Sequence, residues 1–93
     1  MSRAGDAAVI VELFGVSRLR ASYAEVRVPA GTVAEVLRDV ERACPGLGQL
    51  TQSTGRLAAH YLLSLNGERF LDDLQEVLGP GARVLLLSAD AGG

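Results

Sequence analysis

Hydrophobic and polar residues alternate in several short segments of the chain, and this pattern predicts a β-sheet with one helix. Residues 7–15 and 82–88 are apolar on both faces, which is typical of strands in the centre of a sheet. In residues 24–31, two valines alternate with a glutamate and an arginine, so we expect a half-exposed strand there. Residues 60–70 contain an Asn-Gly pair between apolar runs, which predicts a hairpin.

One helix is predicted after the second strand. Thr32 is followed three residues later by Glu35, the spacing of a capping box at a helix N-terminus. Pro45-Gly46 marks the end of the helix. An apolar stripe at helical spacing runs along it. It consists of Val33, Val36, Leu37, Val40 and Cys44.

These elements predict an α+β fold, with a mixed sheet of about five strands and one main helix on one face. The first and last strands are expected to be central, the second strand to lie outside the first, and the other face of the sheet to be open. Residues 71–81 are expected to be a turn-rich crossing with about one helical turn. The predicted core consists of Val9, Val11, Leu13, Val26, Val28, Val36, Leu37, Val40, Leu63, Leu65, Val84 and Leu86.

Composition and charge narrow the class of protein. With 93 residues, 48% of them hydrophobic and 22% charged, the chain is expected to form one globular domain. It has no apolar run of membrane length and no secretion signal at its start, so we expect a soluble cytoplasmic protein with no membrane partner. The net charge is −2 without a basic block, which argues against nucleic acid as a partner.

Few residues suit catalysis or metal binding. All nine basic residues are Arg, which excludes a phosphate-binding loop that needs Lys and a Schiff-base mechanism. With a single Cys and a single His, the usual Cys/His metal site is absent. We interpret Cys44 as a buried core residue, His60 as a surface residue, and Asp72 and Asp73 as solvated acids. No catalytic residue and no metal site are therefore expected.

Two segments carry a resemblance to a known family. Residues 28–47, VPAGTVAEVLRDVERACPGL, and residues 63–93, which end in Ala-Gly-Gly, resemble the MoaD/ThiS family of sulfur-carrier proteins. The length and the Pro-Gly-Leu helix exit look most like the longer cysteine-biosynthesis and molybdopterin-type carriers. The sequence departs from the family's pattern at Ala82, where an acidic residue is common, and at Ser88-Ala89, where prolines are common.

The resemblance implies a ubiquitin-like β-grasp domain over residues 1–88 and a flexible tail over residues 89–93. It implies that an adenylating, E1-like enzyme uses ATP to activate the carboxylate of Gly93, next to Gly92. Sulfur then replaces one oxygen, and the resulting thiocarboxylate supplies a sulfur-accepting biosynthetic enzyme that makes cysteine, molybdopterin or another sulfur-containing metabolite. The chain itself is then a carrier and not an enzyme, and binds no cofactor. Glycine suits such a tail, because it is slim enough to thread a narrow channel.

A partner surface is expected on the open face of the sheet. If Glu12 and Arg83 point to water, alternation puts four large apolar residues beside them: Ile10, Phe14, Leu85 and Leu87. Exposed apolar surface of this kind usually marks a partner site, although a loop or a second copy could also cover it. The resemblance implies that partner enzymes grip this face, and by position it assigns Phe14, Arg69 and Leu87 to the contact.

Three other functions fit the same residues. The chain could be a ubiquitin-like protein modifier conjugated through Gly93, although without Lys it could not form side-chain-linked chains on itself. It could be the small subunit of molybdopterin synthase. It could also be an interaction module in which the two terminal glycines are incidental.

Overall fold

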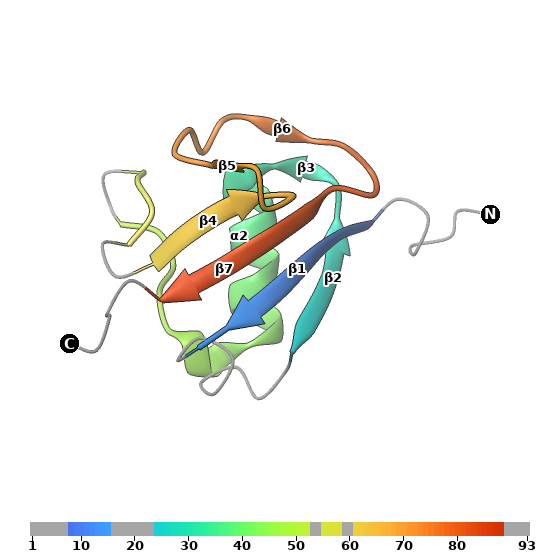
Figure 1. Cartoon of the computed structure of the whole chain (residues 1–93). Coiled ribbons are helices and arrows are strands. Elements are labelled where there is room, and N and C mark those ends of the chain that lie inside the picture. Colours follow the sequence, from blue (N-terminus) through green and yellow to red (C-terminus); the bar gives the residue numbers. More distant parts are fainter. Residues whose placement is uncertain (1–7, 16–23, 53–54, 59–60, 89–93) are drawn as a thin grey trace.

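A computed structural model describes residues 8–15, 24–52, 55–58 and 61–88 of the chain. Its main feature is a five-stranded sheet in the order β2-β1-β7-β4-β5, with helix α2 packed behind one face (Figure 1). A short ladder joins β3 to β6. The elements are β1 (Ala8–Phe14), β2 (Glu25–Pro29), β3 (Gly31–Thr32), α2 (Val33–Ala43), the 3₁₀ turn η1 (Pro45–Leu47), β4 (Tyr61–Leu65), β5 (Arg69–Phe70), β6 (Val77–Leu78) and β7 (Arg83–Ser88).

The predicted order of the strands is confirmed. The first and last strands, β1 and β7, are parallel neighbours in the centre of the sheet, and β2 lies outside β1. The other pairs of the sheet are antiparallel. Leu13 and Leu86 are opposite each other in the central pair, and both are buried against α2. The described part of the chain contains no helix long and apolar enough to cross a membrane.

The predicted core is largely confirmed. Ten of its twelve residues are buried, whereas Val26 and Leu65 are half-buried and pack against the cluster. Its floor is the inner face of β1, β7 and β4, and its roof is the apolar stripe of α2. Residues after the helix add Leu47 and Leu50, because the phenol of Tyr61 donates a hydrogen bond of 2.9 Å to the carbonyl of Leu47 and holds η1 against the sheet.

The capping box predicted at the start of α2 is present. The backbone N–H of Glu35 donates to Thr32 Oγ1 at 3.1 Å, and the backbone N–H of Thr32 donates to Glu35 Oε1 at 2.9 Å. Two N–H groups that a helix start leaves unpaired therefore gain acceptors from side chains of the same turn. This local device fixes where the chain changes from extended to helical.

Removing the cap should destabilise the domain measurably. We expect Thr32→Ala to lower the free energy of unfolding by about 1 kcal/mol, because the hydroxyl acceptor for the Glu35 N–H is lost. Chemical denaturation followed by circular dichroism measures the change. Thr32→Ser, which keeps the hydroxyl, should remain close to wild type. Equal losses in both variants would contradict the capping explanation.

Residues 71–81 are a turn-rich crossing, as expected, but the helical turn expected among them is absent. One tight turn there is closed by a hydrogen bond of 3.1 Å from the N–H of Glu76 to the carbonyl of Asp73. Two carbonyls of this segment, those of Glu76 and Leu74, accept hydrogen bonds of 2.9 Å from the backbone N–H groups of Val33 and Ala34 at the start of α2. The next two residues form β6 and pair with β3. The segment is thus held by partners some 40 residues earlier in the chain, and its own sequence carries no sign of them.

Candidate functional site

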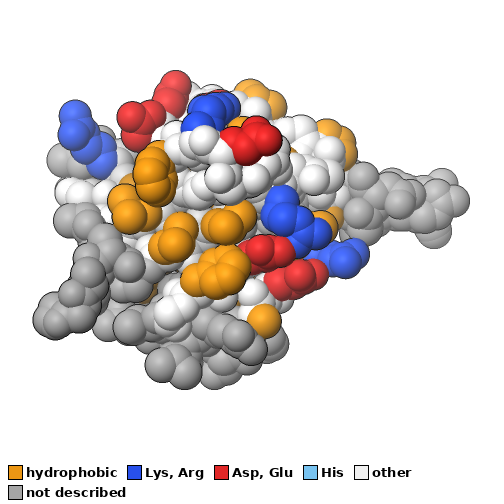
Figure 2. All heavy atoms as spheres, viewed as in Figure 1, with side chains coloured by type: hydrophobic (Ala, Val, Ile, Leu, Met, Phe, Trp, Pro, Cys, Tyr) orange, Lys and Arg blue, Asp and Glu red, His pale blue; other side chains and the backbone are white. Residues whose placement is uncertain are grey.

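The open face of the sheet divides into a charged half and an apolar half. Glu12 on β1 and Arg83 on β7 form an ion pair there, as the predicted face requires. On β2, next to β1, Arg27 and Glu25 form a second pair with 3.6 Å between Nε and Oε2. Figure 2 shows these opposite charges alternating over one side of the face, while apolar side chains gather over the other side.

The apolar half, which we call the apolar patch, comes from four strands. Phe14 and Leu62 flank Leu87 in one cross-strand row. In the next row Leu85 and Phe70 flank Ser64. Of these side chains, Phe14, Leu62 and Phe70 are 43%, 42% and 66% exposed. Leu85 and Leu87 are half-buried between them. The apolar patch consists of Phe14, Leu62, Phe70, Leu85 and Leu87.

The apolar patch lies where the last strand ends. β7 ends at Ser88, whose register partner is Tyr61 at the start of β4. Phe14, at the end of the parallel strand β1, is paired with Leu87. The tail with Gly92 and Gly93 lies outside the described residues, but it begins one residue after this strand. A partner bound to the apolar patch would therefore meet the point from which the tail starts.

The structure brings together three of the five residues expected at a partner site. Phe14, Leu85 and Leu87 are neighbours in the apolar patch. Ile10 is on the same face but one row further from the tail, between Arg27 and Arg83. It is half-buried in the charged half of the face. Its row borders the one that contains Glu12 and Leu85, but its own neighbours in the sheet are the two arginines, so Ile10 is not part of the apolar patch.

Arg69 is not on this face. It is opposite Leu65, whose side chain packs against the core, so it projects toward the helix side at the edge of the sheet. There it forms an ion pair with Glu76, and the hydrogen bond to that carboxylate raises the pKa of the Arg69 guanidinium. The reason is the length of the hairpin loop. A two-residue loop would place Arg69 opposite Ser64 on the open face, but Glu68 belongs to the loop and shifts the register by one residue.

Sequence reasoning missed two members of the apolar patch. Leu62 lies two residues before Ser64 on the same strand, so its alternation with Ser64 could have placed it on the open face. Phe70 carried no such sign, because its face depends on the three-residue loop. That loop uses positive φ angles at Asn66, 54°, and Gly67, 73°. Asn66 Oδ1 also accepts a hydrogen bond of 3.2 Å from the backbone N–H of Arg83.

The other candidate residues have structural roles in the described part of the chain. Cys44 caps the C-terminal end of α2 and is fully buried, and burial raises the pKa of its thiol. The thiol is therefore poorly suited to act as a nucleophile. Asp73 accepts a hydrogen bond of 2.9 Å from the backbone N–H of Gln75. The described residues contain no cluster of three metal-ligating side chains. His60 lies outside them.

Solved structures similar to this chain share its whole fold. The crystal structure of SAMP1 from Haloferax volcanii matches with a TM-score of 0.78 and 26% identity, over 92% of this chain and 99% of that one. The solution structure of small archaeal modifier protein 1 from Methanosarcina acetivorans gives 0.75 and 22%, over 94% and 97%. A putative molybdopterin converting factor subunit 1 from Pyrococcus furiosus gives 0.68 and 18%, over 87% and 95%.

No family model matches the sequence, and no curated protein sequence does so. The structural matches are decisive for the fold, since each covers nearly the full length of both chains. The chain has the ubiquitin-like β-grasp fold of the MoaD/ThiS type, with a mixed five-stranded sheet and one main helix. Its structural neighbours are small modifier proteins and a molybdopterin converting factor subunit, which supports a small ubiquitin-like carrier or modifier.

Proposed function

We propose that this protein is a sulfur carrier whose working group is the carboxylate of Gly93. A partner enzyme adenylates this carboxylate, and a sulfur donor then converts it to a thiocarboxylate. The observation that supports the proposal best is the position of the apolar patch. A large exposed apolar surface lies at the end of β7, and one residue later begins a five-residue tail that ends in Gly-Gly.

The chemistry needs two displacements, both at atoms of the tail and of ATP. A carboxylate oxygen of Gly93 attacks the α-phosphorus of ATP, and pyrophosphate leaves. Hydrosulfide released by the donor then attacks the carbonyl carbon of the acyl-adenylate, AMP leaves, and loss of the proton on sulfur gives the thiocarboxylate. No side chain of the carrier takes part in either step. What the carrier supplies is a slim, reactive end and a surface that positions this end in the enzyme.

The apolar patch is suited to that positioning. Its central residues, Leu85 and Leu87, are flanked by large side chains that are more exposed, which gives a continuous apolar surface on an otherwise polar face. Large apolar residues at the centre of an interface contribute most of the binding energy, and surrounding contacts exclude water. In the charged half, each of these charged side chains already has a partner of opposite charge within the chain. These residues can therefore lie at the border of the interface without opposite charges from the enzyme.

A charge placed in the apolar patch should weaken binding without unfolding the domain. We expect Phe14→Asp to raise the dissociation constant for the adenylating enzyme by at least about tenfold, since a carboxylate would lose its water in the interface. Phe14 is 43% exposed, so we expect its side chain to contribute little to the stability of the domain. Calorimetric titration measures the affinity. Val77→Asp is the matched control, because Val77 is 71% exposed and lies on β6, away from the apolar patch.

The circular dichroism spectrum of Phe14→Asp decides between this account and a structural role. An unfolded variant would show that Phe14 belongs to the core. A folded variant that binds as tightly as wild type would show that the apolar patch is not the interface.

A second function, protein modification, is favoured by the similarity to small archaeal modifier proteins. In that case an amino group of a target attacks the carbonyl carbon of the same acyl-adenylate, AMP leaves, the nitrogen loses a proton, and the bond formed is an amide. The first displacement and the apolar patch serve both functions. They differ in the nucleophile that attacks the Gly93 carbonyl, which is sulfur in one case and nitrogen in the other.

A further inference from the structure

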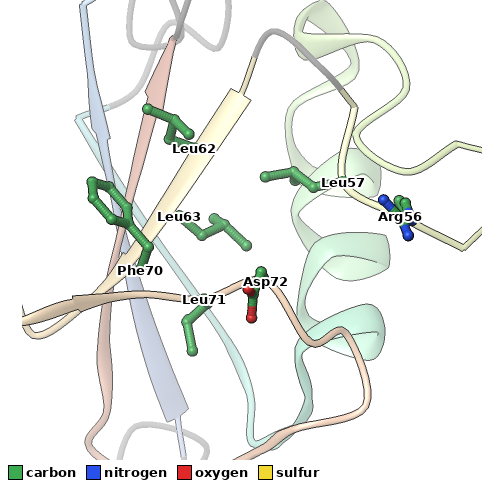
Figure 3. Close-up of a pocket in the computed structure, with 7 residues that line it drawn as sticks. All are labelled: Arg56, Leu57, Leu62, Leu63, Phe70, Leu71 and Asp72. Atoms are coloured by element: carbon green, nitrogen blue, oxygen red, sulfur yellow. The ribbon is translucent and has the colours of Figure 1, made fainter.

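A groove continues the apolar patch around the outer edge of β4. It encloses about 410 Å³ between β4, residues 70–72 and residues 56–57 (Figure 3). Leu63 and Leu71, both buried, form its floor, and Leu57 reaches toward Leu62 from the opposite wall. Leu62 and Phe70 belong to both the groove and the apolar patch. A partner bound to the apolar patch therefore has an open apolar cavity at the edge of its contact surface.

The charges at this groove do not balance in the way those of the charged half do. Arg56 and Asp72 line it on opposite walls. Asp72 forms no ion pair with a described residue, and the nearby Arg69 is paired with Glu76. The backbone carbonyl of Arg56 accepts a hydrogen bond of 2.6 Å from the N–H of Gln52, whereas its guanidinium forms no hydrogen bond or ion pair with any residue in the described ranges. Among the described residues, the guanidinium of Arg56 is thus left for a carboxylate of a partner.

We propose that the groove holds one large apolar side chain of the adenylating enzyme, and that a neighbouring acidic residue of that enzyme pairs with Arg56. This inference rests on the proposed function, and it adds the chemistry of the enzyme's contact residues and the part of the carrier's surface that the enzyme covers. The contact surface of the enzyme on the carrier runs from Phe14 and Leu87, across Leu62, to the outer edge of β4. It leaves the ion pairs of β1 and β2 uncovered, because those charges are already matched.

The test measures the dissociation constant for the purified adenylating enzyme from the same genome and the KM and kcat of adenylation. Arg56→Glu is compared with Arg27→Glu, since both reverse an exposed charge. Phe70→Ser is compared with Val77→Ser, since Phe70 and Val77 are 66% and 71% exposed. We expect about a tenfold weaker affinity and a higher KM for Arg56→Glu and Phe70→Ser, with kcat unchanged. The two controls should stay within about twofold of wild type.

Two further readouts separate the parts of the proposal. The loss caused by Arg56→Glu should shrink as salt is raised, whereas the loss caused by Phe70→Ser should persist. Asp72→Asn should bind at least as tightly as wild type, because it removes a negative charge that opposes the partner's acid. Weaker binding by Asp72→Asn would mean that the partner brings a basic residue, and it would overturn the proposal.

Other outcomes also count against the groove. If wild type is adenylated normally and Arg56→Glu and Phe70→Ser bind as it does, the groove is outside the interface, and the proposed function stands. If wild type binds no adenylating enzyme, both proposals fail. A concentration-dependent dimer that Phe70→Ser dissociates would assign the groove to a second copy of this chain instead.

Discussion

Deleting Gly92 and Gly93 is expected to abolish thiocarboxylate formation and to leave the melting temperature nearly unchanged. The sheet and the core are built from residues between 8 and 88, so the deletion removes none of their described contacts. It does move the terminal carboxylate back to Ala91, two residues closer to the apolar patch. When the apolar patch is bound to the enzyme, the shortened tail would not bring its carboxylate as far as the α-phosphorus of ATP. Intact-protein mass spectrometry and a thermal melt measure the two effects.

A second variant separates the length of the tail from its glycines. Replacing Gly92-Gly93 by Ala-Ala keeps the length and the carboxylate but adds two Cβ atoms. If the tail threads a narrow channel, conversion of this variant should also be strongly slowed. Conversion at the wild-type rate would contradict the role we give to glycine. A thiocarboxylate on the deleted chain would contradict the positioning argument as a whole.

The second large effect is expected in the core. We expect Leu86→Ala to lower the free energy of unfolding by about 2–5 kcal/mol, because truncating a fully buried leucine leaves a cavity in the central strand. Leu86 has no exposed surface and is opposite Leu13 and Leu63 on the two neighbouring strands. For a small domain this is a large share of a total stability of about 5–15 kcal/mol. Denaturant titration followed by circular dichroism measures it.

Leu87→Ala is the matched control for this prediction. It removes the same atoms from the next residue of the same strand, but on the open face. We expect it to cost no more than about 1 kcal/mol in stability and instead to weaken binding of the adenylating enzyme. If both variants lost the same stability and neither lost affinity, the assignment of faces along β7 would be wrong.

The sequence pattern predicted those parts of the fold that depend only on residues close together in the chain. The strands at residues 8–14 and 83–88 were predictable because a strand apolar on both faces must be covered on both sides by other strands, a helix or a partner. The start of α2 was predictable because Thr32 and Glu35 satisfy the helix end within one turn. The open face followed from Glu12 and Arg83, whose charges could not be buried against the helix.

The remaining parts depend on contacts far apart in the sequence. β6 is extended because its neighbours bond to the start of α2, a choice that no property of residues 71–78 reveals. Whether Arg69 or Phe70 joins the open face depends on one extra residue in a hairpin loop. The groove beside Arg56 exists only when residues 56–57 lie against β4. The last two of these features adjoin the candidate site, so the sequence predicts where the site lies better than how far it extends.

The central claim is that Gly93 carries sulfur, and intact-protein mass spectrometry of the wild-type chain tests it most directly. The protein is incubated with ATP, the adenylating enzyme from the same genome and a sulfur donor. We expect a mass change that corresponds to one oxygen replaced by sulfur, located at the C-terminus by fragmentation and absent without ATP. No change in mass, or only an amide linkage of Gly93 to a lysine of a target protein, would contradict the sulfur-carrier account.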